Sequence, residues 1–333
     1  MNPTVASLME NTTDVKLDQP INSHWLPVTG CRLYLRYWQP SYPAKGIVHI
    51  LHGLAEHCSR YQRLAEWLNQ QHFIVIAHDQ RGHGKTGQQA QLGHFGDCNG
   101  WDYLISDVSS VQAWAIKTFG DLPITLIGHS MGSYLAQDFL LTHSRAIHAV
   151  ILSGSNHDLA LKFTVSRWIA QFECWRLGAN TPSRLIDQLV FGRFNRRISP
   201  HHTNHDWLSR DSQQVAAYIA DPLCGFISTP QLWVDLFQAL QRINQVNNLK
   251  SIRSDLPIYV LGGRDDPISA GKRLKCLASA LRTAGIKQVT EAIYVGGRHE
   301  MFNEINFQQV YTDMTDWLNS TFSSTQCNSL HVA

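Results

Sequence analysis

The segment from Ile124 to Ser133 reads I-T-L-I-G-H-S-M-G-S, and it decides the fold. A short apolar run, typical of a buried strand, stops abruptly at Gly128, and a helical pattern follows Gly132. Glycines two residues before and two residues after Ser130 allow the backbone to reverse with almost no side-chain bulk. This pattern indicates a nucleophile elbow, a strained strand-to-helix turn that exposes a serine oxygen above the edge of a sheet.

Strands and helices alternate along most of the chain. Continuous apolar runs, typical of strands covered on both faces, are followed by segments with apolar residues at helical spacing. The sequence therefore predicts an α/β fold, with a mostly parallel sheet and helices on both faces. Besides the elbow strand and the helix after it, we expect a hairpin at 24–38, strands at 46–51, 73–77, 149–152, 257–261 and 289–295, and helices at 61–68, 101–119, 274–281 and 307–318.

The alternation stops in residues 156–254, where helical segments carry many aromatic side chains. Because this stretch lies between two strands, we predict a cap inserted over the strand ends, which divides the core into 21–155 and 255–319. The aromatic side chains form either the core of the cap or a lipophilic entrance. Residues 1–20 are predicted to be a flexible segment and residues 320–333 a disordered tail.

The composition excludes several classes of protein. The chain has 333 residues and a formal net charge of +2, which gives no electrostatic footprint for nucleic acid. The N-terminus lacks the features of a secretory signal, and no apolar run is long enough to span a membrane. The seven cysteines are odd in number and never form C-x-x-C pairs, which favours reduced thiols. We expect a protein in the cytoplasm, with or without peripheral contact with a membrane.

Two later glycine turns carry the residue types that a nucleophilic serine needs. Such a serine requires a histidine base, a carboxylate that orients the histidine, and N–H groups that stabilise an oxyanion. Residues 261–267 read L-G-G-R-D-D-P, and residues 295–300 read V-G-G-R-H-E. Both turns follow predicted strands, whose carboxyl ends are where parallel sheets build sites. Asp265 or Asp266 could serve as the acid or merely cap the next helix, and His299 could be the base or simply pack.

The turn H-G-L-A-E-H at 52–57 fits the remaining requirement. Gly53 permits a close approach of the backbone, and the N–H of Leu54 could point at the oxyanion beside the N–H of Met131. The alternative is a plain glycine turn before a helix.

Two other motifs do not complete a site. Residues 82–86, G-H-G-K-T, end like a phosphate-binding loop, but Asp79 stands where that motif requires glycine. His201, His202 and His205 lack the further ligands of a metal site. We therefore expect neither a cofactor nor a metal.

The motifs together resemble one group of enzymes. H-G-L-A-E-H followed by Arg60-Tyr61, then D-Q-R-G-H-G at 79–84 and G-H-S-M-G, are similar to the monoacylglycerol lipase and lysophospholipase group of α/β-hydrolases. The similarity runs from about residue 24 to 319. It includes D-W-L-S-R-D at 206–211, D-P-L-C-G-F at 221–226 and G-G-R-H-E-M-F-N-E at 296–304. His205 stands where the group tends to have an aromatic residue.

The resemblance assigns roles to individual residues. It implies Ser130 as nucleophile and His299 as base, with the backbone N–H groups of the turn residues named above as the oxyanion hole. In the group, the acid lies nine residues after the proline that opens its strand. Counting from Pro257, that residue is Asp266, and Asp265 is the neighbour to test.

The resemblance implies a cofactor-free serine hydrolase that cleaves carboxylic esters of lipids, either monoacylglycerol or lysophospholipid, with transient contact with a membrane surface. An aminopeptidase or thioesterase of the same fold is an alternative, and a silent scaffold that only binds is the non-enzyme alternative. An aminopeptidase should carry acidic residues in its cap to hold a substrate ammonium. The middle of the cap is instead basic, which suits a phosphate or a solvated face. The basic residues are Arg184, Arg193, Arg196 and Arg197.

Overall fold

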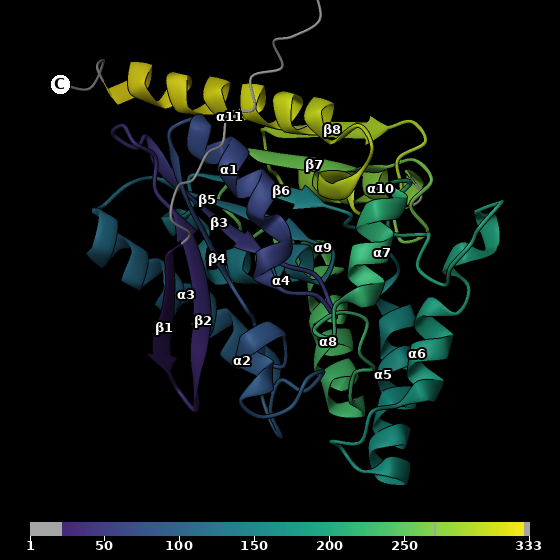
Figure 1. Ribbon diagram of the computed structural model, residues 1–333. Coiled ribbons are helices and arrows are strands. Elements are labelled where there is room, and N and C mark those ends of the chain that lie inside the picture. Colours follow the sequence, from purple (N-terminus) through teal and green to yellow (C-terminus); the bar gives the residue numbers. More distant parts are fainter. Residues whose placement is uncertain (1–21, 270, 330–333) are drawn as a thin grey trace, which may run out of the picture.

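The computed structural model describes residues 22–269 and 271–329, and within them an eight-stranded sheet forms the centre of the molecule (Figure 1). The strand order in the sheet is β1-β2-β4-β3-β5-β6-β7-β8. In this order, each pair of neighbouring strands from β4 onward is parallel. The antiparallel pairings are those of β2 with β1 and β4, so the predicted hairpin lies at one edge. The strands are β1 (Asn22–Val28), β2 (Cys31–Trp38), β3 (Gly46–Leu51), β4 (Phe73–His78), β5 (Ile124–His129), β6 (Ala149–Ser153), β7 (Ile258–Gly263) and β8 (Val289–Tyr294).

Helices cover both faces of this sheet, as the continuous apolar strands predict. In β3, Ile47 and Leu51 face one apolar core, while Val48 and Ile50 face the other. Helices α3, α4, α8 and α10 contribute to the first core, and α1 and α11 to the second. The helices are α1 (Gln62–Gln70), α2 (Gly84–Gln88), α3 (Gly100–Phe119), α4 (Met131–His143), α5 (Ala160–Leu177), α6 (Arg184–Phe191), α7 (Ser212–Ala220), α8 (Pro230–Ile243), α9 (Val246–Leu249), α10 (Lys272–Thr283) and α11 (Phe307–Ser329).

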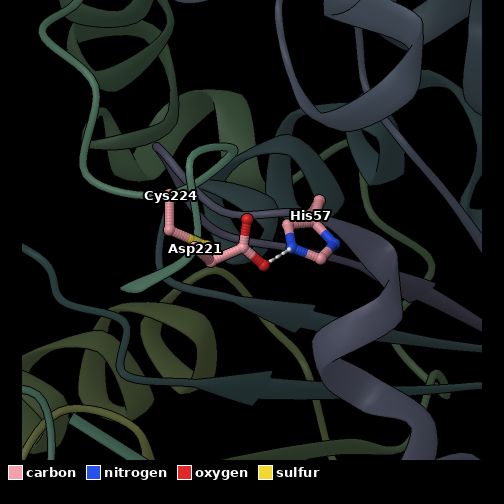
Figure 2. A group of neighbouring side chains, drawn as sticks. All are labelled: His57, Asp221 and Cys224. Atoms are coloured by element: carbon pink, nitrogen blue, oxygen red, sulfur yellow. Dashed lines mark hydrogen bonds and ion pairs between the residues drawn. The ribbon is translucent and has the colours of Figure 1, made fainter. Parts of the chain in front are cut away.

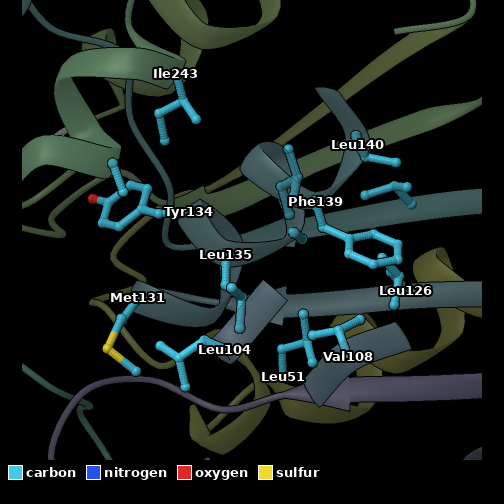
Figure 3. Packing of buried hydrophobic residues seen from close by; sticks show 14 of the residues in the cluster. Leu51, Leu104, Val108, Leu126, Met131, Tyr134, Leu135, Phe139, Leu140 and Ile243 are labelled. Carbon is cyan, nitrogen blue, oxygen red and sulfur yellow. The ribbon is translucent and has the colours of Figure 1, made fainter. Parts of the chain in front are cut away.

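Helix α4 starts directly at the elbow and is buried along most of its length. Met131, Leu135 and Phe139 from this helix pack against Leu104 of α3 and Leu126 of β5 (Figure 3). Burying such side chains contributes roughly 1.5–3 kcal/mol each. The helix that follows Ser130 is therefore fixed by the main core, which holds the serine rigidly in place.

Five helices, α5 to α9, lie between β6 and β7 in the chain, and we propose that residues 156–254 form the cap. Helices α5, α6 and α7 lie away from α11 in Figure 1. Helix α8 is different, because it packs on α3 and α4 as well as on α5, and its Trp233 and Leu240 belong to the main core. The cap and the sheet therefore share one apolar core.

The prediction of a disordered tail is wrong for residues 320–329, where α11 continues as far as Ser329. Phe322 anchors this stretch, because its ring packs on Phe73 of β4 and on His148 just before β6. A Cβ at Gly46 would lie 2.7 Å from the Phe322 ring, so glycine there leaves space for the anchor. Residues 1–20 and 330–333, also predicted to be flexible, lie outside the described residues.

None of the described helices is long and apolar enough to span a membrane.

Candidate active site

Ser130 occupies the sharp turn between β5 and α4. Its backbone lies at φ 50° and ψ −119°, a conformation that L residues rarely adopt. Its N–H donates to Ser153 O at 2.9 Å, and its own carbonyl accepts the Ser133 N–H at 2.8 Å. A Cβ at Gly132 would lie 2.1 Å from the Leu51 carbonyl oxygen, so that glycine is required by close approach. The elbow geometry predicted from the sequence is present.

His299 and Asp266 meet in a buried pair beside this turn. The distance between His299 Nδ1 and Asp266 Oδ2 is 3.1 Å. Ser269 Oγ donates to Asp266 Oδ2 at 2.7 Å, and the Ile268 N–H donates to Oδ1 at 2.8 Å. Burial alone would raise the pKa of Asp266, but the charge and hydrogen bond of His299 and the two other donors hold it below its ordinary value. Burial would lower the pKa of His299, yet the Asp266 carboxylate raises it above its ordinary value.

Asp265, the other carboxylate of the same turn, lies elsewhere. Its side chain is half-exposed and pairs with Arg264 at 3.5 Å. Its backbone N–H donates to Gly297 O at 2.9 Å, which fixes the turn. Of the two neighbouring aspartates, Asp266 is the one that contacts His299.

The two candidate oxyanion donors flank the serine. Leu54 and Met131 both line a cavity that also includes Ser130. A Cβ at Gly53 would lie 3.3 Å from Ser130 Cβ, so the turn before Leu54 passes close to the Ser130 side chain. Within the described residues, the N–H groups of Leu54 and Met131 donate no hydrogen bond, which leaves both free for a substrate oxygen.

Two cavities meet at Ser130. One, of about 420 Å³, has polar lining groups that include Asp187, Asn195 and His205, and His299 also lines it. The other, of about 360 Å³, is bordered mostly by apolar side chains of the cap and of α4. Leu54, Ser130, Phe191 and Ile268 border both cavities. The serine therefore stands where a polar space joins an apolar one.

A buried charge network that the sequence did not reveal connects the turn at Gly53 with the histidine turn. Glu56 accepts the Gly53 N–H at 2.5 Å and an Arg60 Nη1 hydrogen bond at 2.6 Å. Arg60 also forms a bidentate pair with Glu300 at 2.6 and 2.7 Å. Glu300 directly follows His299 in the chain, so Arg60 ties together the two turns. These residues stand in the quoted motifs, but spacing alone could not show that they meet.

The cap segment at 206–211 rests on the histidine turn. The Trp207 carbonyl accepts the His299 N–H at 3.3 Å, and the Leu208 carbonyl accepts the Glu300 N–H at 2.7 Å. The Trp207 ring lies 5.2 Å from the His299 ring. His205, which departs from the resembled pattern, packs on the ring of Tyr218 at 5.3 Å. This cap segment therefore helps to hold His299 in place.

Buried histidines should make the protein acid-labile. Burial lowers the pKa of His49, His52 and His83 to about 3, and lowers the pKa of His129, which also faces His299, to about 4. In the unfolded chain these groups titrate near 6.5, so unfolding takes up protons between that pH and about 3–4. These histidines therefore do not destabilise the fold above about pH 6.5, and they lower the free energy of unfolding as the pH falls below that value.

At pH 5, we expect each of these four histidines to lower the free energy of unfolding by about 2 kcal/mol relative to its value at pH 7. The measurement is chemical unfolding at pH 7, 6 and 5, with the slope and midpoint fitted at each pH. Carboxylates stay mostly ionised in this range, so histidine protonation dominates. A midpoint that did not change between pH 7 and pH 5 would contradict the prediction.

Comparison with known proteins defines the class. Residues 42–306 match the family described as serine aminopeptidase, S33 (Hydrolase_4), which is most of the chain, so the protein belongs to this family. A monoacylglycerol lipase of Mycolicibacterium smegmatis is 27% identical over 296 residues, covering 87% of this chain and 94% of its own. A monoglyceride lipase of Mus musculus is 26% identical over 292 residues, covering 85% of this chain and 84% of its own.

Solved structures share the fold. A thermostable carboxyl esterase from Bacillus coagulans has a TM-score of 0.84 at 23% identity, covering 91% of this chain and 99% of its own. A monoglyceride lipase from Saccharomyces cerevisiae has a TM-score of 0.72 at 20% identity, covering 92% of this chain and 96% of its own. The resemblance predicted from the motifs is confirmed: the chain is an α/β-hydrolase of the monoacylglycerol lipase group, a group of carboxylic ester hydrolases.

Proposed function

We propose that the protein hydrolyses the ester bond of monoacylglycerols through an acyl-enzyme on Ser130. The observation that carries this proposal is the position of Ser130 between an apolar and a polar cavity. The substrate has the same division, with an acyl chain on one side of its ester and a glycerol on the other. The relatives named monoacylglycerol and monoglyceride lipases support the same substrate class.

In the proposed reaction, Ser130 Oγ attacks the ester carbonyl while His299 takes the hydroxyl proton. Asp266 holds the imidazole in position and stabilises its charged form. The N–H groups of Leu54 and Met131 donate to the oxyanion of the tetrahedral intermediate. His299 then returns the proton to the departing glycerol oxygen. Water, activated by the same histidine, attacks the acyl-enzyme and releases the fatty acid.

The charge around the polar cavity favours a neutral glycerol over a phosphate head group. Asp187 and Glu300 line this cavity, and both bring acidic oxygen atoms. The arginines of the cap lie elsewhere: Arg184 borders a separate shallow cavity, and neither Arg193 nor Arg196 lines either cavity at Ser130. Among the described residues, no lysine or arginine lines the polar cavity, so a phosphate there would lie near Asp187 without a cation beside it, whereas Lys162 of the cap lines the apolar cavity.

Aminopeptidase activity is the second candidate, and Asp187 is the observation that favours it. The family description includes aminopeptidases, and a carboxylate in the polar cavity could pair with a substrate ammonium. Glu300 is already paired with Arg60, so Asp187 is the carboxylate in question. However, burial raises the pKa of Asp187, which weakens it as an anionic anchor.

The outer face of the cap carries an apolar surface that fits an aggregated lipid. Trp168, Phe172 and Trp175 of α5 are exposed, with Trp175 80% accessible, while other cap aromatics such as Trp233 are buried. Ile169 belongs to this face and also lines the apolar cavity. The aromatic residues of the cap thus divide between a core and an outer face. We propose that this face contacts membranes or lipid droplets and that acyl chains enter beside it.

Dispersed monooleoylglycerol, a short soluble ester and alanyl-naphthylamide, assayed side by side, test the proposal. We expect the long-chain ester to be hydrolysed with the highest kcat/KM and the amide to be hydrolysed at least about 100-fold more slowly, because burial weakens Asp187 as the anionic partner of a substrate ammonium. A double variant, Trp168→Gln with Trp175→Gln, should lose activity on the dispersed lipid and keep activity on the soluble ester.

Asp187→Asn is the matched control for the peptidase alternative. If the protein were an aminopeptidase, this variant would lose amide hydrolysis and keep ester hydrolysis.

Equal loss of dispersed and soluble ester hydrolysis in the double tryptophan variant would contradict a lipid-facing role for the cap. Hydrolysis of the amide alone would contradict the proposed substrate class.

A further inference from the structure

A second cluster of reactive side chains lies outside the site described above, between the core and the cap. It consists of His57 from the turn after β3 and of Asp221 and Cys224 from the segment after α7 (Figure 2). His57 Nε2 and Asp221 Oδ2 are 2.8 Å apart, and the two atoms and Cys224 Sγ all lie within 4.8 Å of one another. In Figure 2 the Asp221 carboxylate faces the His57 imidazole and lies between it and the Cys224 side chain.

The cluster has the ligand set of a zinc site. Zinc is bound by imidazole nitrogen, carboxylate oxygen and thiolate sulfur, with metal–ligand distances of about 2.0–2.3 Å and tetrahedral geometry. Ligand atoms around such an ion stand about 3.3–3.8 Å apart, so the three atoms need to shift by only about 1 Å. A softer thiolate beside an imidazole favours zinc over magnesium or calcium.

The backbone around the cluster already orients the ligands. Asp221 Oδ1 accepts the Leu223 N–H at 2.8 Å, which leaves Oδ2 directed at His57. The Cys224 N–H donates to the Asp221 carbonyl at 3.0 Å, so carboxylate and thiol belong to one tight turn. His57 is nearly buried, while the side chain of Asp221 is one-third exposed, which gives an ion a path from solvent.

The surrounding charge also suits a cation. Arg60 pairs with both Glu56 and Glu300, and Asp221 belongs to the cluster itself. One guanidinium therefore faces three carboxylates, which leaves this region with a net negative charge.

We propose that His57, Asp221 and Cys224 bind one Zn²⁺, with water as the fourth ligand. On binding, the Cys224 Sγ–H bond breaks, an Sγ–Zn bond forms, and the proton leaves to solvent. The ion would connect core and cap next to a proposed oxyanion donor. The Gly225 N–H, one residue after Cys224, donates to the carbonyl of Ala55 at 2.9 Å, and Ala55 directly follows Leu54 in the chain. Zinc would therefore clamp the cap turn onto the turn that carries a proposed oxyanion donor. This site does not depend on the identity of the substrate.

Cobalt substitution tests the site with the full chain. Chelator-treated protein titrated with Co²⁺ should show thiolate-to-cobalt charge-transfer absorption that saturates at one equivalent and is displaced by Zn²⁺. Cys224→Ser should abolish this absorption, and His57→Gln should weaken binding by more than about 10-fold. Cys276→Ser, which removes an exposed thiol of α10, is the matched control and should behave as wild type.

Thermal unfolding gives a second readout. Zn²⁺ should raise the melting temperature of the wild type and of Cys276→Ser, because the ion binds the folded state only, but not that of Cys224→Ser. Melting without metal verifies that each variant folds. Charge-transfer absorption that persisted in Cys224→Ser, or no saturable Co²⁺ binding to the wild type at millimolar concentration, would overturn the proposal.

Discussion

Replacing Ser130 with alanine should lower kcat for monoacylglycerol hydrolysis on the order of 10⁵-fold. The reason is that the substitution removes the oxygen that is proposed to attack the ester, while the cavities and the proposed oxyanion donors remain. The residual rate would come from binding and from the Leu54 and Met131 N–H groups alone. Steady-state hydrolysis of monooleoylglycerol by the purified variant measures the effect.

Ser133→Ala is the matched control for this prediction. Ser133 Oγ donates to the Ser130 carbonyl at 2.6 Å inside the same elbow, but it is buried in α4 and lines neither cavity. We expect this variant to keep most of the activity, with a loss of no more than about 10-fold from a looser turn. Comparable losses in both variants would mean that damage to the elbow, and not loss of the nucleophile, explains the first result.

Asp266→Asn should lower kcat about 10⁴-fold, and Asp265→Asn should change it by no more than about 2-fold. An amide at position 266 keeps the size of the side chain, yet it can no longer accept the His299 Nδ1–H as a carboxylate does or stabilise an imidazolium. Asp265 pairs with Arg264 at the surface and is the matched control, since it carries the same change one residue away.

The pH dependence separates a positioning effect from loss of the fold. The Asp266 carboxylate raises the pKa of His299, so Asp266→Asn should move the acidic limb of the pH–rate profile to lower pH. A merely structural defect would reduce the rate without moving this limb. If Asp265→Asn were the more damaging change, the assignment of the acid would be wrong.

Local patterns were enough to predict the sheet and the elbow, and they named the candidate residues of the site. Gly128-His129-Ser130-Met131-Gly132 follows an apolar strand, and that context predicts the turn that the structure contains. The residue pattern alone left Asp265 and Asp266 as alternatives, because both stand in the same turn. The resemblance favoured Asp266, and the 3.1 Å contact with His299 supports that choice.

Contacts between distant segments were beyond prediction. Arg60 and Glu300 are 240 positions apart, and no local pattern indicates that they form a bidentate pair. The same reason explains the C-terminal helix, where the Ser/Thr-rich composition conceals an anchor, Phe322. Helix α8 carries the composition of the cap, yet its packing on α3 and α4 places it in the main core. Tertiary packing decided each of these cases over local composition.

We propose that Ser130 forms the covalent intermediate, and labelling with a fluorophosphonate tests this assignment most directly. The probe requires an activated serine, and peptide mapping by mass spectrometry locates the adduct. We predict one adduct per chain, on Ser130, formed more slowly in Asp266→Asn and blocked by excess monooleoylglycerol. An adduct on another residue, or equal labelling of wild type and Ser130→Ala, would contradict the claim.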